Sequence, residues 1–331
     1  MNMNEWMGRL AESRKPMPVL SFPSTQLMGV SVYQLTHDSG IQAEGIQKVA
    51  ERTDAAAAVC MMDLSVEAEA FGCEIKKSEN EIPTVVGTLI ADEEEAEALR
   101  VPKVGDGRTG VYVEAAGKAK VMITDRPVFA GMIGPFSLAG RLMDVSEALV
   151  NCIVEPDFVH AALKKAVEFL TEYALAYKSA GLDGIMIAEP LSGLLSPDLE
   201  KEFSAPYVKQ LIDAVQDQNF AVIYHNCGPN TPLMTESIYQ NGAAAFHFGD
   251  AVDLVQMLEK MPEDKPVCGN ISPSALFMNG TEEEIYSATQ ELMRRCAGHK
   301  NFVLSSGCDI PPASSWKNID AFFRASADFY K

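Results

Sequence analysis

Short runs of β-branched or apolar residues recur along the whole chain, and helical patterns separate them. This alternation is typical of βα units arranged around a parallel sheet. Eight such runs in 331 residues predict an α/β fold, namely a single TIM (β/α)8 barrel. The predicted strands are 17–22, 56–62, 127–133, 184–189, 220–226, 243–248, 266–270 and 302–307.

The segments between these runs carry helix signals. Thr281 and Glu284 form a capping box, and Ser196 followed by Pro197 is a typical helix start. In 157–179, apolar residues at alternating spacings of four and three predict one long helix that covers a barrel face. This stripe consists of Val159, Leu163, Ala166, Leu170, Tyr173 and Tyr177.

One connection is too long for an ordinary βα loop. Residues 72–126, approximately, lie between the second and third predicted strands and are rich in Gly, Lys and Glu. We expect an insertion there that contains a helix and a short hairpin and covers the barrel mouth. No internal repeat or low-complexity linker divides the chain, so we predict that 1–331 is a single TIM-barrel domain.

Charge and composition exclude several classes of partner. The 46 acidic and 27 basic residues give a net charge of −19, which repels nucleic acid and anionic membranes. No run approaches the roughly 18 apolar residues of a membrane helix. The N-terminus does not resemble a signal peptide, so we expect a cytoplasmic protein. The seven cysteines are scattered and odd in number, unlike a disulfide framework.

Three potential metal ligands follow predicted strands. In a TIM barrel, functional groups sit at the C-terminal ends of the strands and face one mouth. His225 and Cys227 end the fifth run and, being two residues apart, point the same way. Cys308 ends the eighth. One imidazole and two thiols without an evident fourth ligand predict a catalytic Zn²⁺ site, although any single cysteine could be a buried small hydrophobe.

Four further polar residues are placed at the same mouth. Glu189 ends the fourth run, and we predict a catalytic role in which its carboxylate occupies the fourth metal position or bonds the thiol proton. A hydrogen bond to a neighbouring loop is the alternative. Asp63, His247 and Asn270 follow the second, sixth and seventh runs. They are predicted to contact a cofactor or the acceptor, and the alternative is that they are satisfied mouth residues.

Five motifs are spread over nearly the whole chain, namely Val66–Ile75, Gly134–Ala139, His225–Gly228, Cys268–Pro273 and Ser306–Pro312. Together they resemble the uroporphyrinogen decarboxylase superfamily, and within it the corrinoid-dependent methyltransferase branch of methylcobalamin:coenzyme M methyltransferases. The resemblance implies a TIM barrel, a zinc ion at its mouth and a methyl group that arrives on a corrinoid.

The chain departs from the decarboxylase branch in its N-terminal part. Decarboxylases resemble one another in an arginine-rich segment that binds the propionates of the tetrapyrrole. The corresponding stretch, Ser21–Val30, contains no arginine. Uroporphyrinogen decarboxylation is therefore a disfavoured prediction, and the role of the decarboxylase aspartate does not transfer to Asp63.

These expectations combine into one predicted function. The chain is expected to be a zinc-dependent methyltransferase that moves a methyl group between methylcobalamin, or a corrinoid carried by a small corrinoid protein, and a thiol such as coenzyme M. Tetrahydrofolate as the pterin acceptor is the alternative. A non-enzymatic corrinoid-binding module is disfavoured, because the cobalt-ligating DxHxxG motif is absent from both His37–Gly40 and His247–Asp250.

Overall fold

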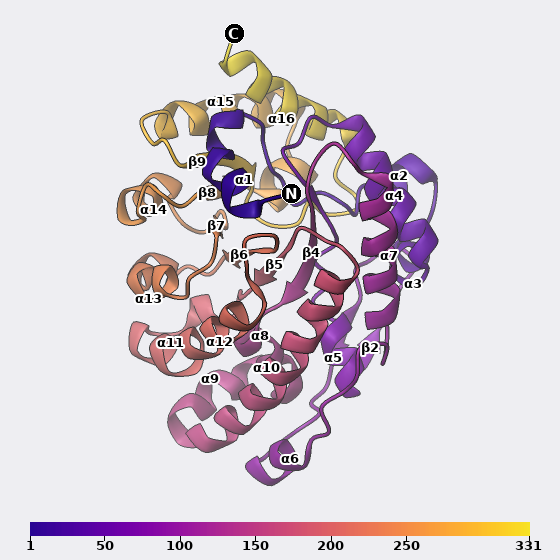
Figure 1. Ribbon diagram of the computed structural model, residues 1–331, viewed down its shortest axis with the longest axis vertical. Coiled ribbons are helices and arrows are strands. Elements are labelled where there is room, and N and C mark those ends of the chain that lie inside the picture. The colour runs from indigo at the N-terminus through magenta and orange to yellow at the C-terminus, as the bar shows by residue number, and fades with distance from the viewer.

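Seven parallel strands form one curled sheet in the computed structural model, which describes residues 1–331 (Figure 1). Hydrogen-bonded neighbours follow the order β1-β4-β5-β6-β7-β8-β9, and each neighbouring pair is parallel. The α/β, TIM-barrel-like architecture predicted from the alternating pattern is confirmed. The strands are β1 (Ala58–Val59), β4 (Val128–Ile133), β5 (Gly184–Ala188), β6 (Ala221–Asn226), β7 (Ala245–Phe248), β8 (Val267–Ile271) and β9 (Phe302–Ser306).

An irregular segment lies between β9 and β1, the two edge strands of the sheet. The Met17 N–H donates to the Leu304 carbonyl of β9 at 2.8 Å, and Ser21 Oγ donates to the Val59 carbonyl of β1 at 2.5 Å. The prediction of a strand at 17–22 is wrong, although the segment occupies the eighth position of the barrel. Pro18 lacks a backbone N–H within it, so a regular ladder cannot form.

Each of the other seven predicted runs contains an observed strand. The second run, 56–62, is reduced to the two residues of β1, which pair only with β4. A strand needs ladder partners to extend, and the irregular segment on its other side supplies few. The remaining runs differ from the observed strands by at most two residues at either end, as expected where strand ends fray into loops.

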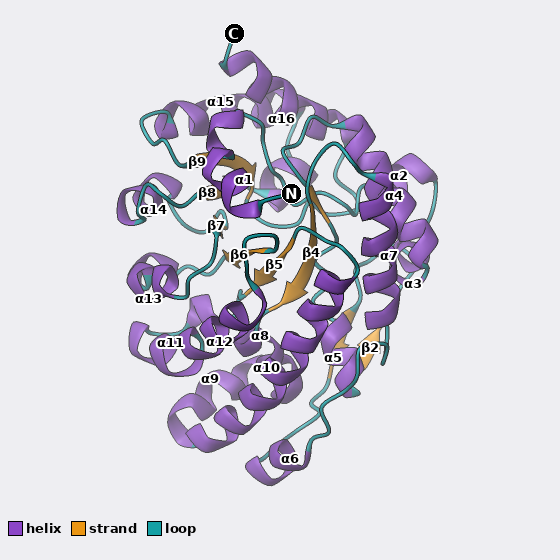
Figure 2. Cartoon of the chain, in the orientation of Figure 1, coloured by secondary structure: helices purple, strands orange, loops and turns teal.

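Helices cover the outside of the sheet (Figure 2). They lie between successive strands, as in repeated βα units. The helices are α1 (Met3–Arg9), α2 (Ser24–Met28), α3 (Val32–His37), α4 (Ser39–Arg52), α5 (Val66–Phe71), α6 (Glu93–Ala98), α7 (Thr109–Met122), α8 (Pro135–Met143), α9 (Val145–Val154), α10 (Pro156–Ser179), α11 (Pro197–Phe203), α12 (Ala205–Val215), α13 (Thr235–Gln240), α14 (Leu254–Lys260), α15 (Glu282–Cys296) and α16 (Trp316–Phe329). Short helical turns are η1 (Ala11–Ser13), η2 (Ser192–Leu194), η3 (Thr231–Leu233) and η4 (Pro273–Met278).

The helix signals read from the sequence are confirmed. The Thr281 side chain accepts from the Glu284 N–H, and the Glu284 side chain accepts from the Thr281 N–H, which completes the capping box of α15. Ser196 caps α11 by accepting from the Leu199 N–H. The whole predicted stripe of α10 is buried, which explains how this helix packs on the sheet.

The predicted insertion consists of several small elements. An antiparallel hairpin forms from β2 (Glu74–Lys76) and β3 (Thr84–Val86), and α6 follows it. The last element of the segment, α7, contacts α4 and β4 and therefore packs as a barrel helix. The insertion outside the barrel is thus shorter than the predicted 72–126, because it ends before α7. Its function as a lid, and the assignment of 1–331 to one domain, stay predictions.

Helix α1 closes the N-terminal end of the barrel. Its Met3 N–H donates to the Gln218 carbonyl, which precedes β6, at 2.7 Å. Met3 and Met7 are buried in the same apolar cluster as Met186 of β5 and Ile223 of β6. Figure 1 shows α1 lying against the sheet near the starts of its strands. The opposite end of the barrel, where the strands terminate, therefore holds the functional groups.

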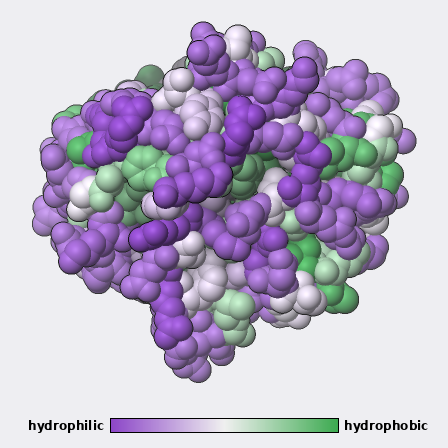
Figure 3. Space-filling view, turned by 90° about the horizontal axis from the view of Figure 1, so that it is seen from above, coloured by the Kyte–Doolittle hydropathy of each residue, from purple (hydrophilic) through white to green (hydrophobic).

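The face of the molecule seen from above is mostly polar. Figure 3 shows hydrophilic residues over most of the face in view, with hydrophobic residues in smaller separate areas. None of the helices combines the length and the apolar character that crossing a membrane requires. The cytoplasmic location stays a prediction.

Candidate metal centre

The three predicted metal ligands meet at the C-terminal end of the barrel. His225 belongs to β6, Cys227 follows this strand directly, and Cys308 lies two residues beyond β9. Their ligand atoms all lie within 4.8 Å of one another, although β7 and β8 separate the two strands. Residues 81 positions apart in the chain are thus brought to a single point by the curl of the sheet.

Glycines make room for this convergence. A Cβ atom on Gly249, in the loop after β7, would lie 2.3 Å from the Cβ of Cys227. A Cβ atom on Gly228 would lie 2.4 Å from the Cα of Gly193, in the loop after β5. Real Cβ atoms do not approach this closely, so the loops after β5, β6 and β7 can pack around Cys227 only without these side chains.

Asn226 holds the turn between His225 and Cys227. Its Oδ1 accepts from the Gly228 N–H and the Thr231 hydroxyl, each at 2.9 Å. Its Nδ2 donates to Ser192 Oγ at 2.9 Å and to the Tyr224 hydroxyl at 3.1 Å. The side chain is fully buried and uses all four of its hydrogen-bonding positions, so it rigidifies the turn that carries two potential ligands.

The imidazole of His225 has one engaged and one free nitrogen. Its Nδ1 lies 2.7 Å from Nδ1 of His247. Its Nε2 is buried and has no hydrogen-bond partner. A buried polar atom normally finds a partner, and this orphaned nitrogen belongs to the residue that clusters with Cys227 and Cys308. The arrangement fits a metal ion bound by one nitrogen and two sulfurs.

The two thiols influence each other. A hydrogen bond between them lowers the pKa of Cys227, and the same bond together with burial raises the pKa of Cys308 to about 12. One thiol therefore ionises more easily at the expense of the other. Both become thiolates only beside a cation, which is the state in which cysteine binds metals.

Glu189 does not belong to the group of metal-ligand atoms. Its carboxylate is buried and accepts from the Phe136 N–H at 2.9 Å and from the Ser137 N–H and hydroxyl at 3.0 and 2.7 Å. Burial raises its pKa to about 7, and these hydrogen bonds oppose the rise. The carboxylate thus sits on the N-terminus of α8, and its predicted catalytic role stays a prediction.

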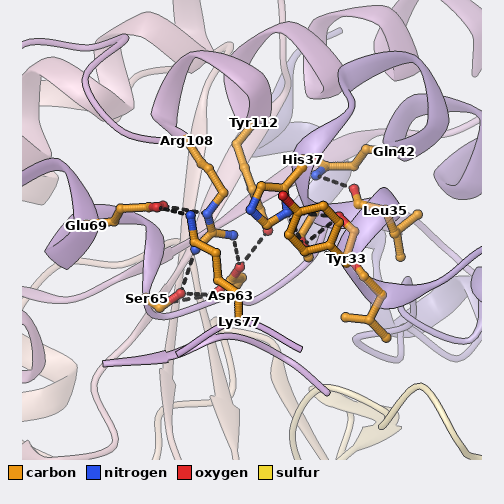
Figure 4. Close-up of polar contacts among 12 residues, drawn as sticks. Tyr33, Leu35, His37, Gln42, Asp63, Ser65, Glu69, Lys77, Arg108 and Tyr112 are labelled. Atoms are coloured by element: carbon orange, nitrogen blue, oxygen red, sulfur yellow. Dashed lines mark hydrogen bonds and ion pairs between the residues drawn. The ribbon is translucent and has the colours of Figure 1, made fainter. Parts of the chain in front are cut away.

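Asp63 is enclosed by protein donors. Its Oδ2 accepts from Arg108 at 2.5 Å and from the Tyr112 hydroxyl at 2.8 Å, and its Oδ1 accepts from the N–H and hydroxyl of Ser65. Figure 4 shows Arg108 between Asp63, Ser65 and Glu69. A ligand that contacts Asp63 must displace one of these donors, so a cofactor-binding role for this residue stays a prediction.

His247 and Asn270 are engaged within the protein. His247 is fully buried on β7, with Nδ1 at His225 and Nε2 at Ser305 Oγ, 2.8 Å away. Asn270 Nδ2 donates to the Gly249 and Val252 carbonyls, each at 2.9 Å, and so fixes the loop after β7. A contact of His247 with a corrinoid or an acceptor would require one of its bonds to break, whereas the bonds of Asn270 engage only its Nδ2, and both predicted roles stay predictions.

Several residues of the site were missed in the sequence. Arg108, Gly249 and Ser305 lie in none of the five motifs, and their roles depend on partners far away in the chain. Asn226 lies within the motif His225–Gly228 but was not predicted to have a role of its own. Asn226 could have been singled out, because it lies between two predicted ligands on a strand that ends in Gly-Pro. Nothing in the sequence indicates that Arg108 pairs with Asp63.

Comparisons with known proteins agree with this architecture. Residues 13–329 match the family model of uroporphyrinogen decarboxylase (URO-D). A methylcobamide:CoM methyltransferase MtbA of Methanosarcina acetivorans is 27% identical over 274 residues, which cover 81% of this chain and 78% of the relative. A methylated-thiol–coenzyme M methyltransferase of Methanosarcina mazei is 25% identical over 331 residues, which cover 96% of this chain and 86% of the relative.

A solved structure shows the same fold. It is a methyltransferase from Methanosarcina mazei, which is 24% identical and superposes with a TM-score of 0.86 over 100% of both chains. At this identity the comparison establishes the shared barrel architecture. The match to the family model extends over nearly the full length and includes all three clustered ligands. The chain therefore belongs to the uroporphyrinogen decarboxylase (URO-D) family.

Proposed function

We propose that this chain is a zinc-dependent methyltransferase that transfers a methyl group between a methylated corrinoid and a small thiol such as coenzyme M. One observation carries the proposal: a ring nitrogen of His225 and the sulfurs of Cys227 and Cys308 all lie within 4.8 Å of one another, and Nε2 of this imidazole is buried without a hydrogen-bond partner. Nitrogen and sulfur donors suit Zn²⁺, and three protein ligands are the pattern of a catalytic zinc site with an open position.

The three side chains would hold zinc at the end of the barrel. Bound zinc would supply a Lewis acid that lowers the pKa of a coordinated thiol. His225 is only 2% exposed, whereas Cys227 and Cys308 are partly exposed. The two cysteines are thus the more exposed members of the group, and we expect the acceptor thiol to approach from their side.

Neighbouring groups would keep the site rigid. The Glu189 N–H donates to the His225 carbonyl at 2.9 Å, and the Glu189 carboxylate holds the start of α8. Asn226 fixes the turn to Cys227. Positioning of this kind contributes to the rate because the reacting sulfur and methyl carbon must be held about 3–3.5 Å apart. A direct catalytic role for Glu189 requires its carboxylate to leave the helix terminus.

The substrates are proposed from the relatives. The two methanogen proteins are named as methylcobamide:CoM and methylated-thiol–coenzyme M methyltransferases. This chain is proposed to use the same kinds of substrate, namely a corrinoid held by a small corrinoid protein and coenzyme M or a related thiol. Decarboxylation of uroporphyrinogen is not supported, because Ser21–Val30 contains no arginine that could bind the propionates.

The first test is a methyl-transfer assay. Zinc-loaded protein is mixed with free methylcobalamin and a panel of thiols that includes coenzyme M, and cob(I)alamin formation is followed by absorbance. We expect turnover with at least one thiol. Absence of cob(I)alamin with every thiol would refute the proposal. Methyltetrahydrofolate with cob(I)alamin serves as the comparison reaction, and turnover there alone would indicate a pterin acceptor instead.

The second test is metal analysis of the Cys308→Ala variant. Loss of one of three ligands should reduce bound zinc from about one ion per chain to a small fraction of that and should abolish methyl transfer. Cys152→Ala is the matched control, since Cys152 is a buried cysteine of α9 that does not belong to the cluster. Equal zinc content in the two variants would show that Cys308 is not a ligand.

A further inference from the structure

A chain of hydrogen bonds extends from His225 into the barrel. His225 Nδ1 lies 2.7 Å from His247 Nδ1, and His247 Nε2 lies 2.8 Å from Ser305 Oγ. Ser305 Oγ in turn lies 2.7 Å from the carbonyl oxygen of Met17. All three side chains are at most 2% exposed, so water does not compete for these bonds. The chain links β6, β7, β9 and the segment that closes the barrel.

The direction of the hydrogens follows from the end of this chain. A carbonyl oxygen only accepts, so the single hydroxyl hydrogen of Ser305 points to Met17. Ser305 Oγ must then accept from His247, which places a hydrogen on His247 Nε2. A neutral imidazole has one donor nitrogen and one acceptor nitrogen. His247 Nδ1 is therefore an acceptor, and its partner, His225 Nδ1, must be the donor.

A doubly protonated His247 would reverse the last bond, but its environment disfavours that form. The ring is fully buried, and its side-chain hydrogen-bond partners are His225 and Ser305, neither of which is a carboxylate. Burying an unpaired cation costs several kcal/mol. With the hydrogen on Nδ1, the lone pair of His225 is on Nε2, the nitrogen without a partner.

We propose that His247 is a positioning residue that, supported by Ser305, holds His225 in the tautomer whose Nε2 lone pair binds the metal. This inference rests on the proposed function and assigns His247 a role other than corrinoid contact. A hydrogen bond to the far nitrogen of a metal-bound histidine fixes the ring orientation and raises its basicity, and its loss typically weakens metal binding about 10- to 100-fold.

Nuclear magnetic resonance of protein with ¹⁵N-labelled histidine tests the tautomers directly. The chain has five histidines, so single-histidine substitutions assign the signals. We expect hydrogens on His225 Nδ1 and His247 Nε2, both with and without zinc. A hydrogen on His225 Nε2 in the zinc-free protein, or on His247 Nδ1, would overturn the inference. This measurement does not depend on activity.

Zinc affinity of variants provides the second readout, measured by competition with a chromophoric chelator. His247→Phe keeps a planar ring and removes the acceptor, and we expect about 10- to 100-fold weaker zinc binding. His247→Asn retains a short acceptor and should lie between this variant and wild type. His160→Phe is the control, because His160 packs on Phe203 and Tyr207 outside the barrel, and its zinc affinity should be unchanged.

The outcomes separate this inference from the proposed function. If a folded His247→Phe variant binds zinc with wild-type affinity, the positioning role of His247 is overturned and the proposed zinc site is not. The expected tautomers in a wild-type protein that binds no zinc would refute the proposed function alone. Should His247→Phe fail to fold, the histidine tautomers and the affinity of His247→Asn still decide the question.

Discussion

Gly249 is the residue that most tightly limits the space around Cys227. Its ideal Cβ position is 2.3 Å from the Cys227 Cβ and 3.2 Å from the Gly307 carbonyl oxygen. Both neighbours belong to loops that carry a proposed metal ligand. Neither can move away without displacing a sulfur, because Cys227 is held by the Asn226 turn and Cys308 directly follows Gly307. The two sulfur positions thus depend on a residue that binds nothing itself.

We expect the Gly249→Ala variant to lose most of its zinc. The added methyl group must push Cys227 or the loop after β9 aside, at a stability cost of about 1–3 kcal/mol. Zinc per chain and the urea unfolding midpoint measure the two effects. Gly8→Ala is the control, since no atom lies within 4 Å of its Cβ position in α1. Wild-type zinc content and affinity in Gly249→Ala would contradict this account.

At the scale of elements, Arg108 joins α5, α7 and the loop after β1. It stands at the N-terminus of α7, pairs with Asp63 at 2.5 Å and with Glu69 of α5 at 2.5 Å, and donates to Ser65 Oγ at 2.8 Å (Figure 4). Lys77 of the hairpin segment also pairs with Glu69, at 2.7 Å. These ion pairs connect both ends of the insertion that contains β2 and β3 to the barrel.

Removal of the Arg108 guanidinium should therefore be costly. We expect Arg108→Met to lower the free energy of unfolding by about 3–5 kcal/mol, because the buried Asp63 carboxylate loses its counter-charge. The second substitution Asp63→Asn should restore part of this loss. Urea unfolding measures both variants.

Arg100→Met is the matched control for this experiment. Arg100 pairs with Asp106 at 2.9 Å, but its side chain is 75% exposed, so its loss should cost at most about 1 kcal/mol. Equal destabilisation by Arg100→Met and Arg108→Met would contradict the argument that burial makes the Arg108 pairs important.

At the scale of the whole molecule, the barrel closes through single hydrogen bonds. Between β9 and β1 the segment 17–22 contacts its neighbours at separate points, and side chains supply part of the bonding. Ser306 Oγ accepts from the Val19 N–H at 3.0 Å, and Ser21 Oγ donates to the Val59 carbonyl. Closure therefore depends in part on the side chains of Ser306 and Ser21, whereas the other neighbouring strands are joined by regular backbone ladders.

The Ser306→Ala variant tests this form of closure. It leaves the buried Val19 N–H without an acceptor, so we expect a loss of about 1–3 kcal/mol in the free energy of unfolding and faster hydrogen exchange at Val19. Ser287→Ala, an exposed serine within α15, should change stability by less than about 0.5 kcal/mol. Unchanged stability and exchange in Ser306→Ala would show that this bond does not close the barrel.

Local and periodic features of the sequence determined much of the architecture. Seven of the eight predicted runs contain strands, the α10 stripe is buried and the caps of α11 and α15 form as expected, because each depends on residues close together in the chain. The spacing of His225 and Cys227 places both at the end of β6. The three candidate ligands, on which the proposed zinc chemistry rests, were also predicted from the sequence.

Only the tertiary structure decided how these parts meet. Three contacts join residues 45 to 58 positions apart: Asp63 with Arg108, Glu189 with the start of α8, and His247 with Ser305. A fourth joins His225 and His247, which lie on neighbouring strands. Such contacts depend on strand register and loop packing, which no local pattern encodes. The sequence by itself therefore determined which atoms could bind a metal, and the curled sheet decided which nitrogen of His225 is left free to do so.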